Sequence, residues 1–361
     1  MIASIRLQSF KGHRDTVVPL GRFTMLVGPN GTGKTSVLQA LELLSKLVNE
    51  PPAHVLREEL SPLDLQHRSS REPVTISVNG FIQVLADTAC HVSVQLSAPT
   101  AGQEAQVAAA WGFEGKHPSK EGHVNAPLRT LWGEEFTRLL GAAVLYHFDA
   151  RQIASVSFSS EENPVVEYDG SNTAVVLAAL KLEREEAFAQ VETELRKIVP
   201  SVLRIRVRRV KMPGAGEAQV GNKVFLDFKG AADVPAHAAS EGTLVTLALL
   251  TVLCSPNRPR VLLLDDIDQS LHPQAQAQLI RELKGLLESF PELQIVATTH
   301  SPYVLDELDP ADVLVFASRE DGAVACRRLS EHPQADQMKG MLTAGQLWTL
   351  DPESRWVVGA E

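Results

Sequence analysis

Apolar positions recur at two different periods along the chain, and each period predicts a type of element. Residues 2–7 alternate and residues 23–27 form a short apolar run, so both segments are predicted to be strands. A glycine-rich loop follows the second strand. Apolar residues then recur at helical spacing from Val37 until Pro51 and Pro52 stop the run. The N-terminal end is therefore predicted to fold as strand, strand, loop and helix.

The next part of the chain returns to two-residue alternation, from Val74 to about Phe113. Asn79-Gly80 interrupts this alternation and is typical of a tight hairpin turn, so we expect an antiparallel sheet that begins with a hairpin. A polar loop is predicted near residues 115–127, and a buried strand at 143–148.

The middle of the chain is helical in character. Ser171 or Asn172 is expected to cap a helix that runs to Leu180, and the helical period continues from Phe188 to Pro200. Strands are predicted at 202–211 and 223–228, and an apolar helix at 242–253. We interpret this region as a helical lid or arm that is too short for a long coiled coil.

Strands and helices alternate in the last third: strands at 261–264, 294–298 and 313–316, with helices at 274–290 and 302–308. This order is typical of a parallel sheet covered by helices. We expect three parts: an N-terminal lobe with the glycine loop and antiparallel sheet (1–155), the lid or arm insertion (156–232), and a C-terminal lobe (233–361).

Composition limits the class of protein without naming its partner. The 361 residues are 44% hydrophobic and 22% charged, which favours a globular chain over a disordered one. No signal peptide is evident and no stretch approaches the ~18 apolar residues of a membrane helix, so we expect a cytoplasmic protein without a membrane partner. A net charge of −10 argues against a surface that is basic throughout, but a local basic stripe would still allow DNA contact. Cys90, Cys254 and Cys326 lie far apart, which argues against a zinc site.

The glycine loop matches the P-loop pattern completely, from Gly28 to Thr35. In such a loop main-chain N–H groups surround the phosphates of ATP, Lys34 reaches the β- and γ-phosphates, and the Thr35 hydroxyl is a ligand of Mg²⁺. The predicted nucleotide-binding residues are Pro29, Asn30, Gly31, Thr32, Gly33, Lys34, Thr35 and Ser36. A glycine turn before a helix is the alternative without a ligand.

Two carboxylates follow the apolar strand at 261–264. Their place at the carboxyl edge of a parallel sheet predicts that Asp265 holds the magnesium shell and that Asp266 orients or deprotonates the attacking water. An ordinary turn also favours Asp-Asp, and the preceding P-loop is what favours the catalytic interpretation.

Three further motifs follow in a fixed order: Ser240-Glu241-Gly242-Thr243, Leu271-His272-Pro273, and Thr298-Thr299-His300-Ser301-Pro302. With the P-loop and the acidic strand, they resemble the head of the RecF, SMC and OLD-type ABC ATPases, most closely the compact single-chain members of genome-maintenance or phage-defence loci. The resemblance covers residues 1–50 and 235–320. It implies an α/β P-loop NTPase fold: an ABC-ATPase-like head with an antiparallel β-subdomain and a helical lid insertion.

The resemblance also implies roles for individual residues. Ser240 and Gly242 correspond to the signature motif that contacts the γ-phosphate held by a second subunit, so ATP would lie at the interface of a homodimer. The segment 271–273 would be the dimer-facing loop, and His300 would sense the γ-phosphate as a third catalytic residue beside Lys34 and Asp266. The alternatives without a ligand are a capped helix at Ser240 and a strand-end histidine at 300.

The chain departs from the family pattern in ways that bear on activity. The family usually has Glu where this chain has Asp266, which predicts slow hydrolysis. The signature lacks the Leu-Ser-Gly-Gly form of transporters, which argues against a transport subunit. Gln66, Gln83 and Gln152 are equal candidates for the glutamine that links magnesium to the lobe interface. Residues after His300 carry no acidic cluster of the TOPRIM type found in OLD nucleases, so we expect any nuclease to be a separately encoded effector.

A basic segment provides the only sequence signal for nucleic acid. We predict that Arg204, Arg206, Arg208, Arg209 and Lys211 share one strand face, as a phosphate track or as a solvated surface. The leading hypothesis is an Mg-ATP-dependent dimeric ATPase that acts on DNA or on a partner effector. The alternative is a slow or non-hydrolysing switch that dimerises on ATP.

Overall fold

The computed structural model describes residues 1–58, 62–67, 72–82, 88–97, 106–113, 119–130, 137, 140–158, 161, 163–212 and 219–358. The chain divides into two compact units. Unit 1 comprises Met1–Leu145, Arg260–Ile267 and Glu292–Glu361, and unit 2 comprises Tyr146–Pro259 and Asp268–Pro291. The three-part division expected from the sequence stays a prediction.

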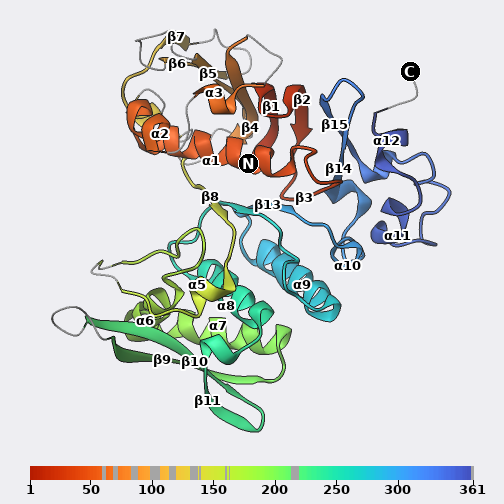
Figure 1. Ribbon diagram of the computed structural model, residues 1–361. Helices are drawn as coiled ribbons and strands as arrows, with labels where there is room; N and C mark the ends of the chain where they lie inside the picture. The colour runs from red at the N-terminus through yellow and green to blue at the C-terminus, as the bar shows by residue number, and fades with distance from the viewer. Residues whose placement is uncertain are drawn as a thin grey trace. The chain divides into compact units, whose positions relative to one another are not determined.

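Unit 1 contains two six-stranded sheets, with strand orders β2-β1-β4-β5-β6-β7 and β15-β14-β3-β13-β12-β8 (Figure 1). The first is antiparallel and consists of β1 (Ile2–Phe10), β2 (His13–Pro19), β4 (Val74–Ile82), β5 (Thr88–Ser97), β6 (Gln106–Phe113) and β7 (Ser119–His123). The second consists of β3 (Phe23–Val27), β8 (Ala143–Tyr146), β12 (Val261–Leu264), β13 (Gln294–Thr298), β14 (Val313–Ser318) and β15 (Val324–Arg328). Helices of this unit are α1 (Lys34–Asn49), α2 (Pro52–Glu58), α3 (Pro62–Leu65), α10 (Pro302–Leu305), α11 (Ala344–Trp348) and α12 (Glu353–Trp356), with 3-10 turns η2 (Leu128–Thr130), η4 (Pro310–Asp312) and η5 (Leu329–Glu331).

The central strands of the second sheet determine where the site forms. β12, β13, β3 and β14 are parallel neighbours in that order. All residues of β3, β12 and β13 are buried, as expected for strands covered on both faces. Because β13 lies between β3 and β12, the loops that follow these three strands meet at one edge of the sheet. The predicted bounds of β3, β12 and β13 are confirmed.

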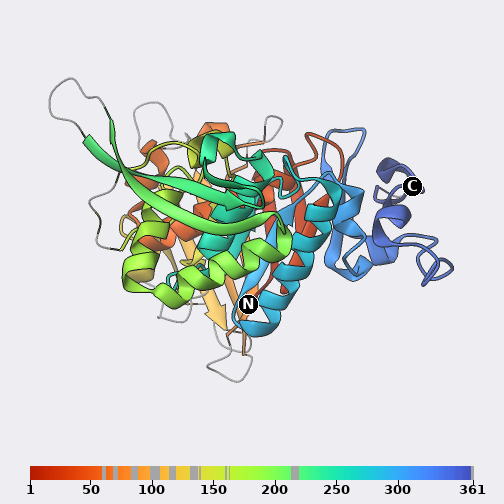
Figure 2. The same cartoon turned by 90° about the horizontal axis from the view of Figure 1, so that it is seen from below.

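Unit 2 combines helices with a three-stranded antiparallel sheet of order β11-β10-β9. Its elements are α5 (Ala150–Ile153), α6 (Thr173–Glu183), α7 (Glu185–Ile198), β9 (Val202–Met212), β10 (Gln219–Phe228), β11 (Ala231–Pro235), η3 (Ala236–Ala238), α8 (Glu241–Cys254) and α9 (Pro273–Ser289). β9 and β10 form a long curved ribbon, which Figure 2 shows from below. The helix α8 is almost entirely buried. From Gly242 to Cys254 every residue except Val245 is buried.

The hairpin turn predicted at Asn79-Gly80 is wrong. β4 continues through both residues and pairs on one side with β1 and on the other with β5, where Asn79 lies opposite His91 and Gly80 opposite Cys90. The Asn79 Oδ1 and His91 Nδ1 atoms are 2.7 Å apart. Pairing on both sides outweighs the local turn preference of the Asn-Gly pair.

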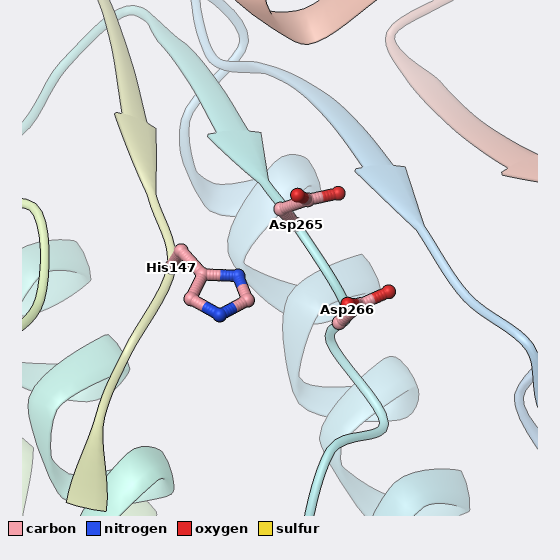
Figure 3. Close-up of side chains that lie close together, drawn as sticks. All are labelled: His147, Asp265 and Asp266. Atoms are coloured by element: carbon pink, nitrogen blue, oxygen red, sulfur yellow. The ribbon is translucent and has the colours of Figure 1, made fainter. Parts of the chain in front are cut away.

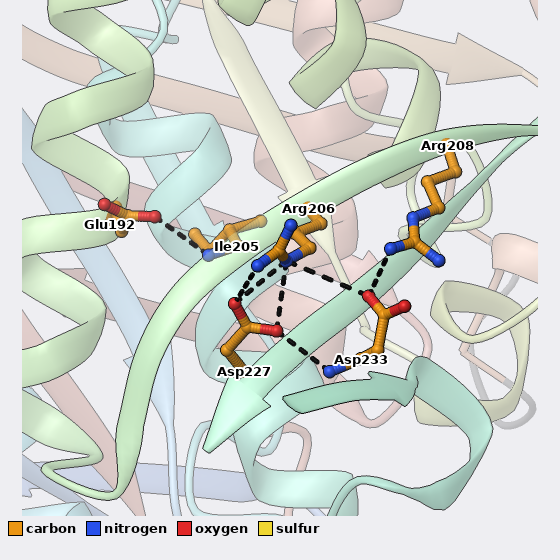
Figure 4. Close-up of polar contacts among 6 residues, drawn as sticks. All are labelled: Glu192, Ile205, Arg206, Arg208, Asp227 and Asp233. Atoms are coloured by element: carbon orange, nitrogen blue, oxygen red, sulfur yellow. Dashed lines mark hydrogen bonds and ion pairs between the residues drawn. The ribbon is translucent and has the colours of Figure 1, made fainter. Parts of the chain in front are cut away.

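The prediction for the basic strand is also wrong in part. Because β9 is a continuous strand, its alternation places Arg204, Arg206 and Arg208 on one face, and Arg209 and Lys211 on the other. Two of these cations have acidic partners, which Figure 4 shows: Arg206 pairs with Asp227 at 2.7 Å, and Arg208 pairs with Asp233 at 2.5 Å. These pairs reduce the charge that the strand offers to a phosphate backbone.

Candidate nucleotide site

The P-loop lies between β3 and α1 and has the conformation that its glycines allow. Gly28, Gly31 and Gly33 all have positive φ angles, of 140°, 79° and 83°. A Cβ atom on Gly28 would lie 2.3 Å from the main-chain oxygen of Phe316 in β14, so only glycine fits there. The Gly28 requirement is therefore both conformational and steric.

Lys34 occupies the centre of this loop. Its side chain is buried, and Nζ donates to the carbonyl oxygens of Gly28 at 2.8 Å and Pro29 at 2.9 Å. Burial lowers the pKa of the ammonium group, while the charges of Asp266, Asp265 and then Glu353 oppose that shift. A cation held under a loop of main-chain amides suits a triphosphate, whose negative charge would replace the carbonyl contacts.

The amino end of α1 adds a second feature that suits phosphate. α1 starts at Lys34, has no side chain that caps it, and carries no acidic residue in its first turn. Its first N–H groups and its dipole are thus directed at the loop without a competing carboxylate. Loop, lysine and helix end together fit the phosphates of a nucleotide.

A pair of oxygen donors stands beside the lysine. Asp265 and Asp266 follow β12, as Figure 3 shows, and the Thr35 hydroxyl donates to Asp265 Oδ1 at 3.0 Å. A hydroxyl and a carboxylate this close form an all-oxygen donor set, and Mg²⁺ prefers oxygen ligands. Thr35 and Asp265 therefore have the oxygen atoms that the magnesium of Mg-ATP would need, and their role as its ligands stays a prediction.

Asp266 and His300 lie together at the same sheet edge. The His300 Nε2 atom is 3.8 Å from Asp266 Oδ1, and each of these side chains is 41% exposed. Asp266 has a φ of 52°, a left-handed conformation that Asp adopts more readily than most residues. The two predicted catalytic side chains are thus close to each other and accessible to water.

The predicted signature residues lie in unit 2, next to the predicted dimer-facing loop. Ser240 is the N-cap of α8, and its Oγ accepts from the Thr243 N–H at 3.3 Å. A Cβ atom on Gly242 would lie 2.8 Å from the Ser270 oxygen and 2.9 Å from a methyl carbon of Leu271. The glycine therefore allows the loop at 270–271 to approach the helix closely.

A surface hollow of about 660 Å³ adjoins these residues within unit 2. Its lining includes Ser240, Gly242, His272, Lys197 and Arg281. The helix N-terminus on this concave surface suits an anionic group, while Lys197 pairs with Glu194 at 2.7 Å and with Glu282 at 3.5 Å.

The glutamine candidates remain dispersed. The Gln66 amide donates to the Glu72 carbonyl at 2.8 Å, Gln152 is exposed on α5, and Gln83 lies outside the described residues.

Two side chains hold the site together without a role predicted from the sequence, one of them outside every motif and the other, Thr298, within the motif that contains His300. His13, at the start of β2, is fully buried, and its Nε2 lies 3.1 Å from the Gly33 carbonyl, to which it donates. Burial lowers its pKa to about 4. Thr298, the last residue of β13, contacts both Asp265 and Asp266. Both residues are distant in sequence from their partners. The position of Thr298 near the two acids could have been predicted only from the expected pairing of β13 with β12 in a parallel sheet.

Two protein-family models match the chain. One is described as an AAA ATPase domain and matches residues 1–92, and the other as an AAA domain, putative AbiEii toxin, Type IV TA system, and matches residues 136–306. The two matches include the P-loop, the signature residues, the acidic strand and His300. Both the segment that carries the P-loop and the segment that carries the acidic strand and His300 therefore match ATPase-domain models.

Among curated proteins, the chain is similar to Septu protein PtuA of Bacillus mycoides (strain KBAB4), with 29% identity over 108 residues, 28% of this chain and 15% of that protein. PtuA of Bacillus thuringiensis is 38% identical over 69 residues, which are 19% of this chain and 17% of the relative. An OLD nuclease of Thermus scotoductus (strain ATCC 700910 / SA-01) is 41% identical over 44 residues, 12% of this chain and 8% of that nuclease. The matched segments thus span less than a fifth of each relative.

Among solved structures, an SMC head bound to the C-winged helix domain of ScpA superposes with a TM-score of 0.60 at 16% identity, covering 91% of this chain and 98% of the other. The SMC head domain from Thermotoga maritima gives a TM-score of 0.53 at 13% identity with the same coverage. The fold is therefore that of an α/β P-loop ATPase resembling an SMC head. In the part of the chain that the structure describes, no helix is long and apolar enough to cross a membrane.

Proposed function

With an ATPase domain of SMC-head-like fold as the premise, we propose that the chain binds Mg-ATP and hydrolyses it to ADP and phosphate. The observation that carries this proposal is the gathering of five side chains at one sheet edge. Thr35 contacts Asp265, His300 lies 3.8 Å from Asp266, and the buried Lys34 experiences the charges of both carboxylates. Each has the chemistry that phosphoryl transfer requires: a cation, two oxygen ligands, a carboxylate and an imidazole.

The residues act in distinct ways in this proposal. The P-loop amides and Lys34 orient the triphosphate, and Thr35 with Asp265 would hold magnesium, which supplies charge neutralisation on the phosphate oxygens when bound. Asp266 accepts a hydrogen bond from the attacking water and takes its proton. His300, 3.8 Å from that carboxylate, donates to the γ-phosphate.

We further propose a head-to-tail homodimer with ATP at the interface. Support comes from unit 2, where Ser240, Gly242 and the loop at 270–272 line one concave surface with Lys197 and Arg281. A γ-phosphate bound by one protomer would meet this surface on its partner. The N-cap role of Ser240 is compatible with this, because the main-chain N–H groups at a helix start remain directed outward.

The biological role proposed is phage defence or DNA maintenance together with a separately encoded effector. The partial similarity to Septu PtuA proteins supports the former. DNA is a second candidate partner, and Arg209 and Lys211, both exposed on the same face of β9, are the residues we would test first for contact with its phosphates.

A dimerisation switch with little turnover is the second candidate. The observation that favours it is Asp266, whose side chain is one methylene shorter than that of the usual Glu and therefore reaches less far toward the attacking water. Both candidates require ATP-dependent dimerisation, and they differ in whether the dimer reopens by hydrolysis.

Light scattering with size-exclusion chromatography tests the dimer. Mg-ATP with Asp266→Asn is expected to shift the protein from monomer to dimer, because ATP is then bound but not consumed. Lys34→Ala is the matched control and should stay monomeric. If Mg-ATP leaves the molar mass of the Asp266→Asn variant unchanged, the proposed interface is contradicted. Reopening of the wild-type dimer after ATP is consumed would favour the ATPase, and a dimer that persists would favour the switch.

A further inference from the structure

Thr298 has a buried hydroxyl group that belongs to neither the P-loop nor the signature motif, and the proposed function gives it no role. It is the last residue of β13, the strand between β3 and β12, and its side chain has no exposed surface. Its position therefore brings it to the loops that follow both neighbouring strands.

The hydrogen bonds of this hydroxyl can be fully assigned. Its oxygen lies 2.7 Å from Asp265 Oδ1, and because the carboxylate only accepts, the single hydroxyl hydrogen goes to Asp265. The Asp266 N–H then donates to the same oxygen at 2.8 Å. The main-chain carbonyl of Thr298 accepts from the Ile267 N–H at 3.1 Å. One residue thus contacts three successive residues of the acidic loop.

These contacts fix a turn that is otherwise unfavourable. Asp266 has a φ of 52°, a conformation that non-glycine residues retain only where surrounding contacts hold them. The N–H groups on either side of the Asp266 Cα, its own and that of Ile267, are both bonded to Thr298. The direction in which the Asp266 carboxylate leaves the chain, toward His300, therefore depends on Thr298.

From this geometry we propose that Thr298 is the positioning residue that couples the two acids of the site. Its hydroxyl orients the Asp265 carboxylate toward Thr35 and its oxygen holds the Asp266 turn, so one group sets both the magnesium ligand and the water-activating carboxylate. This inference rests on the proposed function, since it assigns Thr298 a role toward the same Mg-ATP site.

Substitution by residues of similar size separates this role from packing. Thr298→Val keeps the side-chain volume but removes the donor to Asp265 and the acceptor for the Asp266 N–H, whereas Thr298→Ser keeps both. Thr24→Val is the matched control, because Thr24 is an equally buried threonine on β3 whose hydroxyl oxygen accepts from the Gly21 N–H at 2.9 Å. Thr298→Ala serves in place of Val if the Val variant does not fold.

The first measurement is amide hydrogen exchange at Asp266 in protein free of nucleotide and metal. Loss of the acceptor is expected to accelerate this exchange roughly tenfold or more in Thr298→Val, with Thr298→Ser and Thr24→Val close to wild type. An unchanged exchange rate in Thr298→Val would overturn the inference, whatever the protein does with ATP.

The second measurement is the Mg²⁺ dependence of ATP binding. Thr298→Val is expected to need roughly tenfold more Mg²⁺ for half of the metal-dependent gain in affinity, while ATP affinity in EDTA, which depends on the P-loop, stays within about twofold. Equal Mg²⁺ dependence in Thr298→Val and wild type would overturn the coupling. A wild-type chain that binds no ATP would instead overturn the proposed function, and the exchange result at Asp266 would still report separately on the hydrogen bonds of Thr298.

Discussion

His13 is predicted to make the stability of unit 1 depend on pH. The imidazole is fully buried below the P-loop, donates to the Gly33 carbonyl, and its Nδ1 has no hydrogen-bond partner among the described residues. Burial, followed by the nearby His67, lowers its pKa from 6.5 to about 4, although the Gly33 contact opposes the shift. The folded state therefore holds this histidine neutral over a range in which the unfolded chain protonates it.

The sign and size of the effect follow from this difference in pKa. Between pH 6.5 and pH 4 the unfolded state binds more protons than the folded state, so the free energy of unfolding falls as the pH falls. The contribution is complete above pH 6.5 and is lost as the pH falls through about 4, where the folded state is protonated as well. A shift of ~2.5 units at ~1.4 kcal/mol per unit gives a loss of about 3 kcal/mol.

His13→Gln is the variant that isolates this effect, because its amide can still donate to Gly33 but does not titrate. Urea unfolding followed by tryptophan fluorescence reports on unit 1, since the sequence of unit 2 includes no tryptophan. Between pH 7.5 and pH 4 the wild type is expected to lose about 3 kcal/mol more than the variant. Comparing changes with pH cancels any constant difference in stability between the two proteins. Equal pH dependence in both would refute the assignment of a buried neutral histidine.

Three substitutions test other contacts of the site. Gly28→Ala should lower the free energy of unfolding by roughly 2 to 4 kcal/mol, because its φ is 140° and its Cβ would clash with the main chain of Phe316. Gly230→Ala, where φ is 85° and the space around the residue is open, should cost only about 1 kcal/mol; equal losses in urea unfolding would argue against the clash. Gly242→Ala should displace the loop at 270–271, because its Cβ would clash there. Light scattering should then show no ATP-dependent dimer, while the ATP affinity of the monomer stays unchanged. A dimer as stable as that of the wild type would contradict the role of Gly242 in the interface. Asp266→Glu should raise the steady-state rate of phosphate release, because the longer side chain brings the carboxylate closer to the attacking water. It should also lower the free energy of unfolding by up to about 1 kcal/mol, because Glu tolerates the left-handed φ less well than Asp does. A rate of phosphate release below that of the wild type would contradict the importance of side-chain length.

The sequence predicts the parallel core and its motifs because both depend on local patterns. β3 and β13 are short, mostly apolar runs of five residues, and their length and their glycine-rich or polar flanks favour a strand over a helix. The position of the P-loop between β3 and α1 follows directly. The closeness of Asp265 to Thr35 also follows, because the carboxyl ends of all parallel strands in one sheet, here β12 and β3 with β13 between them, lie at the same edge.

Other features depend on pairing between distant segments, which one sequence does not reveal. Asn79-Gly80 is a turn by local preference and a strand because β1 and β5 flank it. The sequence of the basic strand predicts a uniformly cationic surface. In the folded protein, Asp227 of β10 and Asp233 of β11 form ion pairs with two of its arginines. His13 lies 20 residues from Gly33 in sequence, and the polar segment around it, Lys11-Gly12-His13-Arg14-Asp15, gives no local sign of a buried histidine that supports the P-loop.

The most direct test of the account is steady-state phosphate release from the purified chain with Mg-ATP, with Lys34→Ala and Asp266→Asn as controls. We expect slow but measurable turnover by the wild type, loss of turnover in both variants, and loss of ATP binding only in Lys34→Ala, because Asp266 acts on water and Lys34 on the phosphates. Turnover that survives in Asp266→Asn would contradict the assigned carboxylate. ATP affinity that is unchanged in Lys34→Ala would contradict the nucleotide site itself.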